Sequence, residues 1–167
     1  TTSSPITDNT TFTATYKDKD YTLTLPDTNG VSFEVEGATL KDGVYTVTHG
    51  TPVTITMTVT GNVKVTELSY QIDGQNKNTV ETNNDGITSK AFTIDGENIT
   101  GAISVTIKST ETYQITVTVE GGNGKVNGNT ESATVTVDKG TTATELADMF
   151  NFEPNPGYKV DAITPAF

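Results

Sequence analysis

The stretch that decides the fold reads Tyr113-Gln-Ile-Thr-Val-Thr-Val-Glu-Gly-Gly-Asn-Gly-Lys-Val126. From Tyr113 to Val119, apolar and polar side chains alternate with period two, which is the pattern of a strand with one buried face. Gly121-Gly-Asn-Gly124 then predicts a turn, because glycine and asparagine tolerate positive φ angles. The stretch therefore predicts a mainly β chain made of short strands and tight turns.

The same alternation recurs along the rest of the chain. It is clearest from Val53 to Thr60, where apolar side chains face one way and threonines the other. In residues 63–72 the alternation slips near Glu67, which predicts a β-bulge. Residues 73–89 are predicted to form a long loop or a weakly packed edge hairpin. Strands are expected at residues 11–16, 21–25, 31–35, 44–48, 53–60, 63–72, 90–94, 102–107, 113–119, 133–137 and 158–163.

One segment departs from the strand pattern and predicts a short helix near residues 142–150. Leu146, Met149 and Phe150 recur at helical spacing, and Thr142 or Thr144 can act as the N-cap. Prolines at positions 154 and 156 end the helix, and the final strand at 158–163 follows.

Composition limits both the core and the chemistry of the chain. Only 32% of the residues are hydrophobic, while threonine makes up about a fifth, so thin cores with solvated threonine faces are expected. Cysteine is absent, which excludes disulfides, thiolate nucleophiles and cysteine metal sites. No cofactor is therefore expected.

Charge excludes two classes of partner. The net charge is −11 and all ten basic residues are lysines, so the chain repels nucleic acid and anionic membrane surfaces. No apolar run is long enough for membrane insertion, and because the chain begins with Thr1 we expect a processed protein or a fragment.

Two motifs occur twice. Tyr21-Thr-Leu-Thr-Leu25 aligns with residues 113–117, and Val47-Thr-His-Gly-Thr51 aligns with Val137-Asp-Lys-Gly-Thr141. The separations are 92 and 90 residues, which indicates a duplicated module, although threonine-valine alternation also produces chance similarity. The predicted organisation is a flexible leader at residues 1–10, a sandwich at 11–109 and a second module at 110–167, joined at residues 109–112.

The second module resembles the bacterial cell-surface repeats of the internalin B-repeat type. The resemblance is carried by Val137-Asp-Lys-Gly-Thr141, by Pro156-Gly-Tyr-Lys-Val160, and by the opening from Tyr113 to Gly122. Those repeats are β-grasp-like modules on Gram-positive surface proteins; they usually carry a Gly-Trp ending, which is missing here. The first hundred residues resemble Ig-like surface modules. The resemblance implies an Ig-like β-sandwich followed by a small β-grasp-like module with one short helix.

What the resemblance implies about function is a non-catalytic stalk, spacer or adhesion module. The expected location is extracellular, on the cell surface or secreted, and a cysteine-poor, threonine-rich, acidic composition is typical of Gram-positive exteriors. The expected partners are neighbouring modules of the same polypeptide and a host or cell-wall glycan or protein.

The alternative function is a carbohydrate-binding module of a secreted or wall-attached glycan-degrading protein. Sugar faces stack on aromatic rings, and the candidate glycan contacts are Tyr16, Tyr45, Tyr70 and Tyr158. This hypothesis predicts that the tyrosines form one strip on an exposed sheet face.

Catalytic and metal-binding motifs are not found in the sequence, so an enzyme is not expected. His49 is the only histidine and is predicted to be a solvated turn residue. Glu34 and Glu36 are interpreted as a solvated strand face rather than a catalytic pair.

The Asp- and Asn-rich segments at residues 73–76, 83–86 and 95–98 are interpreted as Asx turns rather than calcium loops. Lys41, Lys64 and Lys90 lie near strand ends, which leaves a Lys-Asn isopeptide bond as an open alternative.

Overall fold

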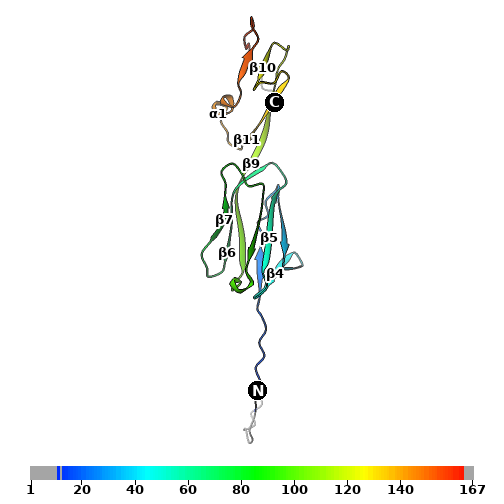
Figure 1. The fold of residues 1–167 in the computed structure, drawn as a ribbon, viewed down its shortest axis with the longest axis vertical. Coiled ribbons are helices and arrows are strands. Elements are labelled where there is room, and N and C mark those ends of the chain that lie inside the picture. Colours follow the sequence, from blue (N-terminus) through cyan, green and yellow to red (C-terminus); the bar gives the residue numbers. More distant parts are fainter. Residues whose placement is uncertain (1–10, 12, 164–167) are drawn as a thin grey trace.

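A computed structural model describes residue 11 and residues 13–163 of the chain and shows a mainly β protein (Figure 1). The leader predicted for residues 1–10 lies outside the described residues. The strands are β1 (Asp20–Thr24), β2 (Val31–Glu36), β3 (Thr39–Lys41), β4 (Val44–Thr48), β5 (Val53–Val59), β6 (Val63–Ile72), β7 (Asn78–Thr82), β8 (Ser89–Ile94), β9 (Ile103–Thr118), β10 (Gly124–Val126), β11 (Ser132–Asp138) and β12 (Phe152–Pro154). A 3₁₀ turn, η1 (Gly96–Asn98), and one helix, α1 (Ala143–Asp148), complete the fold.

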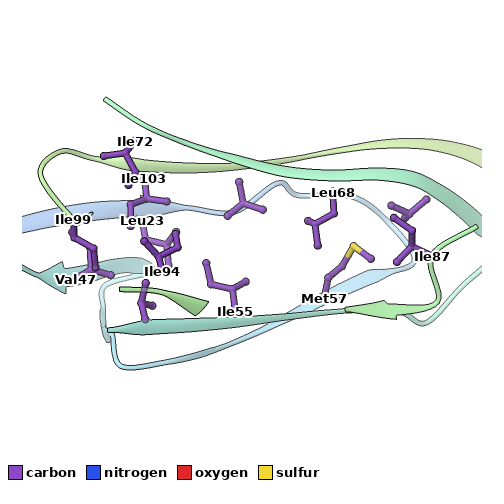
Figure 2. Close-up of a cluster of buried hydrophobic side chains, with 13 residues drawn as sticks. Leu23, Val47, Ile55, Met57, Leu68, Ile72, Ile87, Ile94, Ile99 and Ile103 are labelled. Atoms are coloured by element: carbon purple, nitrogen blue, oxygen red, sulfur yellow. The ribbon is translucent and has the colours of Figure 1, made fainter. Parts of the chain in front are cut away.

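Two sheets pack face to face around the larger core. One sheet has the strand order β3-β4-β1-β9-β6-β7, and the other has the order β2-β5-β8. Figure 2 shows the side chains of both sheets pointing into the space between them. The buried members are Leu23, Val47, Val53, Ile55, Met57, Val65, Leu68, Ile72, Ile87, Ile94, Ile99, Ile103 and Val105.

Strand β5 confirms the pattern that predicted it. Val53, Ile55 and Met57 have no exposed surface, and the threonines between them face outward. On that outer face the Thr54 hydroxyl hydrogen-bonds the Thr93 hydroxyl of β8 at 2.8 Å. The branched threonines therefore stabilise the pairing of β5 with β8 on the face of the sheet that does not pack against the core.

The predicted bulge in β6 is confirmed. The register of β6 against β9 shifts between Val65 and Glu67, so Thr66 is the extra residue. Because of this insertion, Val65 and Leu68 are both buried although they are an odd number of positions apart. The segment after β6, predicted as a loop or edge hairpin, contains the edge strand β7, which pairs with β6.

Strand β9 is the longest element and belongs to both parts of the molecule. Its residues Ile103–Glu111 pair with β6, and its residues Thr112–Thr118 pair with β11. Near its start it also lies parallel to β1, with Leu23 opposite Ile103. The strands expected at residues 102–107 and 113–119 are therefore one continuous strand, because both neighbours hold the backbone extended across residues 109–112.

A smaller second core lies around the distal half of β9. Val126, Ala133 and Phe150 are buried, and half-buried side chains of β9, β11, α1 and β12 pack against them. We call residues 20–111 the proximal region and residues 112–155 the distal region. The predicted domain boundary at 109/110 stays a prediction.

The repeated motifs occupy equivalent places in the two regions. In the proximal region β1 pairs with β4, with Tyr21 opposite Val47; in the distal region β9 pairs with β11, with Tyr113 opposite Val137. The following turns also match. His49 N donates to Lys19 O at 3.0 Å and Lys139 N donates to Glu111 O at 2.8 Å. The strands that follow each ladder also pair in equivalent ways: β2 pairs antiparallel with β5 in the proximal region, and β10 pairs antiparallel with β12 in the distal region.

Helix α1 begins where a capping box was available. The Thr142 hydroxyl accepts from Glu145 N at 3.3 Å, and the Glu145 carboxylate accepts from Thr142 N at 2.8 Å. Of the three apolar residues at helical spacing, Phe150 is buried and Leu146 is half-buried, whereas Met149 is exposed; the helix itself ends at Asp148.

Two predicted strands are wrong. Thr11 and residues 13–19 contain no strand, and neither do residues 155–163. Both segments alternate in sequence, but no neighbouring strand pairs with them, and alternation alone does not supply hydrogen-bond partners. The chain instead forms β12 at Phe152–Pro154, where proline stands at a strand end and needs no ladder donor.

Within the described residues, no helix has both the length and the apolarity that crossing a membrane requires.

Candidate functional site: the joint between the two cores

The joint lies where β9 changes its neighbours, between Ile107 of the first core and Ile115 of the second (Figure 1). On one side of β9, Thr112 N donates to Asn62 O at 2.9 Å and ends the ladder with β6. On the opposite side, Lys139 N donates to Glu111 O at 2.8 Å and begins the ladder with β11. The two ladders therefore overlap, and the backbone of the joint is held continuously.

Apolar side chains are interrupted at the joint, and charged groups take their place. Glu111 shares the face of β9 that carries the apolar side chains, and its carboxylate accepts from Lys139 Nζ at 2.8 Å and from the Tyr113 hydroxyl at 3.0 Å. These hydrogen bonds, that of Lys139 first, lower the pKa of Glu111. The bond to Glu111 raises the pKa of Lys139, in agreement. Because the pair is exposed to solvent, it orients the two side chains but adds little to the free energy of unfolding.

A second ion pair crosses the joint on the other face. Lys64 of β6 lies opposite Thr110 and pairs with Asp138 of β11, which lies opposite Thr112. Gly86 covers the lysine stem: a Cβ on this residue would lie 3.2 Å from Lys64 Cγ. A side chain there would require the flexible stem to shift by a few tenths of an ångström.

A shallow groove of about 400 Å³ surrounds this second pair. It is lined by Asn84, Asp85, Thr112, Thr136 and the ion-paired residues, together with valines of β5 and β6. Within the described part of the chain, no cluster of three metal-ligating side chains occurs and no buried side-chain polar atom lacks a hydrogen-bond partner. Lys64 and Asp138, two of the charged residues in the groove, thus already pair with each other.

Another charged group, at the bulge of β6, is structural. Glu67 pairs with Lys77 and Lys108. Their hydrogen bonds, Lys108 first, lower the pKa of Glu67 to about 2. Glu67 thereby fixes the end of the β7 hairpin to β9.

The four tyrosines proposed as glycan contacts do not form a strip. Tyr16 is 92% exposed in the segment before β1, and Tyr158 is 57% exposed after β12. Tyr45 and Tyr70 are half-buried against the first core, and the Tyr70 ring stacks on Phe92 with centroids 5.4 Å apart. The structure brings no two of them together, and glycan binding stays a prediction.

The remaining candidate residues have structural surroundings. His49 lies in the turn after β4, with Nδ1 3.0 Å from Ile99 O, so it is half-buried rather than fully solvated. In the turn at 83–86, Asp85 N donates to Asn83 Oδ1 at 3.0 Å, which is the Asx turn that was predicted. Glu34 and Glu36 are exposed on β2, as expected.

Of the lysines considered for an isopeptide bond, two are paired with carboxylates. Lys64 contacts Asp138, and Lys90 contacts Glu81 at 2.6 Å. Lys41 is exposed at the end of β3. Among the residues that the structure describes, no asparagine hydrogen-bonds the ammonium group of either paired lysine.

The ion pairs at the joint were not predicted from the sequence, where Lys64 stood out only as an isopeptide candidate. Lys64 and Asp138 are 74 positions apart, and nothing local in either strand marks them as partners. A partial signal was present in the duplication, since Asp138 and Lys139 stand where the first copy has Thr48 and His49. The second copy therefore carries charges at the positions that face its neighbour.

Comparison of this chain with protein-family models, with curated proteins and with solved structures finds no match.

Proposed function

We propose that the chain is a non-catalytic spacer or adhesion segment of a bacterial surface or secreted protein of the Gram-positive type. The finer fold that belongs to this proposal is an Ig-like sandwich in the proximal region and a β-grasp-like module in the distal region. The acidic, cysteine-free, threonine-rich composition and the resemblance to surface repeats support an extracellular location.

The observation that carries the spacer role is the continuity of β9 through both cores. Modules joined by a peptide linker reorient freely, whereas a strand with ladders on both sides of the joint resists bending. The ion pairs Lys139–Glu111 and Lys64–Asp138 lie on the two faces of this strand. Residues 13–19 lead away from one end of the proximal region, and the distal region lies at its opposite end, as a spacer requires (Figure 1).

A distance measurement between spin labels tests the spacer role directly. The chain has no cysteine, so Asp42→Cys and Glu131→Cys place one label in an exposed turn of each region. We expect a single narrow distance distribution. The control pair, Asp42→Cys with Asp85→Cys, lies within the proximal region and defines the width of a rigid body. A cross-joint distribution much broader than the control contradicts the proposal.

A further inference from the structure

We propose that tension along the chain opens the distal region before the proximal region, so that the spacer lengthens in two separate steps. The inference rests on the proposed function as a load-carrying spacer. It follows from how each region holds the strands through which force enters and leaves.

In the proximal region, force enters through β1 and leaves through β9. These strands are parallel neighbours, with Leu23 opposite Ile103 and Thr24 opposite Ser104. Pulling β1 toward its N-terminus and β9 toward its C-terminus therefore drives them in opposite directions along their lengths. Hydrogen bonds between strands that slide in this way are loaded together rather than one after another.

Neighbouring strands and buried side chains strengthen this connection. β1 is also paired with β4 along Asp20–Leu23, and β9 is paired with β6 along Ile103–Glu111. Leu23, Ile103 and Val105 are buried in the first core, so sliding either strand moves apolar side chains out of a closely packed interior.

In the distal region, force enters through β9 and leaves after β12. β12 has three residues and is held by the three-residue strand β10, with Asn155 N donating to Asn123 O at 3.0 Å just beyond it. Only Phe152 of β12 packs against the second core, and it is half-buried. The strand β12 is therefore shorter and less buried than either loaded strand of the proximal region. The proximal region resists sliding mainly through β4, β6 and the first core, since β1 and β9 share only two register pairs.

Release of β12 exposes what remains of the distal region. Phe150, which lies between α1 and β12, is one of only three buried side chains in the second core. Once β12 and α1 separate from β11, the β9–β11 ladder has no apolar layer above it, and an isolated two-stranded ladder is marginal in water. The distal region thus opens as a unit, whereas the sandwich below it stays closed.

Single-molecule force spectroscopy on the whole chain, with handles at its two ends, tests the inference. We expect a first step at lower force that releases the extended length of residues 112–155, about 150 Å, less the distance that the folded distal region already spans. A second step at higher force then releases the extended length of residues 20–111, about 300 Å, less the distance that the folded proximal region spans. One step of the combined length, or the longer step occurring first, overturns the inference.

Two variants assign the steps to the two regions. Phe150→Ala should lower the force of the short step, or remove that step, and leave the long step unchanged. Leu23→Ala should lower the force of the long step alone, while its exposed neighbour variant Thr24→Ala changes neither step. A change of the long step in Phe150→Ala contradicts the inference. A broad spin-label distance distribution would contradict the rigid spacer role but would leave the order of opening untouched. A wrong order of force steps would contradict the order of opening alone, so the two failures are distinguishable.

Discussion

The two regions of this molecule share a backbone ladder and differ in what covers it. Tyr21 opposite Val47 and Tyr113 opposite Val137 begin the same antiparallel pairing, and the same turn hydrogen bonds follow. In the proximal region a second sheet, β2-β5-β8, closes over the ladder. In the distal region the cover is two three-residue strands and one short helix.

This difference shows that the repeated sequence motif sets the register and not the stability. The β-branched residues and the glycine turn recur in both copies, so the ladders form alike. The amount of burial depends on the segments outside the motif that cover each ladder. The first core has thirteen buried residues and the second core has three. Because burial of apolar surface is the main favourable term in folding, the distal region should be the less stable one.

The largest effect is expected from a cavity in the first core. Ile55→Ala removes a side chain with no exposed surface from the centre of β5 and should cost about 4 kcal/mol of unfolding free energy. Urea unfolding followed by circular dichroism measures this cost. The exposed β1 variant Thr22→Ala is the control and should change it by less than about 0.5 kcal/mol. An Ile55→Ala cost below about 1 kcal/mol would show that the two sheets do not pack as described.

A cavity in the second core should unfold one region alone. Phe150→Ala should cost the distal region about 3 kcal/mol, which is a large part of what so small a core supplies. In two-dimensional NMR spectra we expect resonances of residues 112–155 to collapse to unfolded positions while those of β2, β5 and β8 stay. Met149→Ala, at an exposed neighbouring position, should leave both sets in place. Loss of both sets in Phe150→Ala would mean that the cores fold as one unit.

Equal effects are expected where the copies are alike. Gly50 and Gly140 occupy the same turn position, with φ angles of +83° and +92°, and a Cβ added at either would meet no atom within 4 Å. Gly50→Ala and Gly140→Ala should each cost about 1 kcal/mol, because only the backbone conformation resists the new side chain. Asparagine at either position should recover part of the loss, since it tolerates positive φ. Chemical denaturation that resolves the two regions tests this, and clearly unequal costs argue against the duplication.

The smallest effect is a pH dependence of the charged groups. The folded pKa values of Glu67 and Glu111 lie below the usual value of 4.5, so their stabilisation is present above that pH and is lost as the pH falls, toward about 2 for Glu67. The pKa of Lys139 is raised above 10.5, so its stabilisation is present below that pH and is lost as the pH rises through the raised value. Thermal unfolding from pH 2 to pH 12 should show both declines. Glu111→Gln should reduce the loss of thermal stability at alkaline pH, because Lys139 then has no carboxylate partner. If the alkaline loss of stability is unchanged, it comes from other groups.

Most strands of the sandwich could be predicted from sequence because they have one buried face, whereas the short, fully exposed strand β3 was not predicted. Val53–Val59 and Val63–Ile72 are clear examples, since the alternation of β5 and the slip in β6 directly reflect which residues contact the core. The helix was predictable as well, because its capping box is local. Residues 158–163 have an equally regular pattern and form no strand, since a pattern does not show whether a partner strand is in reach.

The joint could not be predicted for a related reason. Glu111 and Lys139 meet only because β11 returns along β9, and Lys64 meets Asp138 only because β6 and β11 lie on opposite sides of that strand. Each contact depends on tertiary pairing, whereas the sequence shows isolated charges in threonine-rich strands. Ser109 and Glu111 interrupt the apolar pattern of β9, and the interruption marks the gap between the cores rather than the end of a strand.

The uninterrupted strand also determines on which face of β9 each of the two cores lies. Ile103, Val105 and Ile107 of the first core and Ile115 and Val117 of the second all stand at odd positions of β9, on one side of the pleat. Inserting a single residue between Lys108 and Thr112 would reverse this parity and turn the distal region to the opposite face. Inserting two residues would restore the face and lengthen the molecule by about 7 Å. Length variation at the joint is therefore expected to be tolerated in steps of two residues.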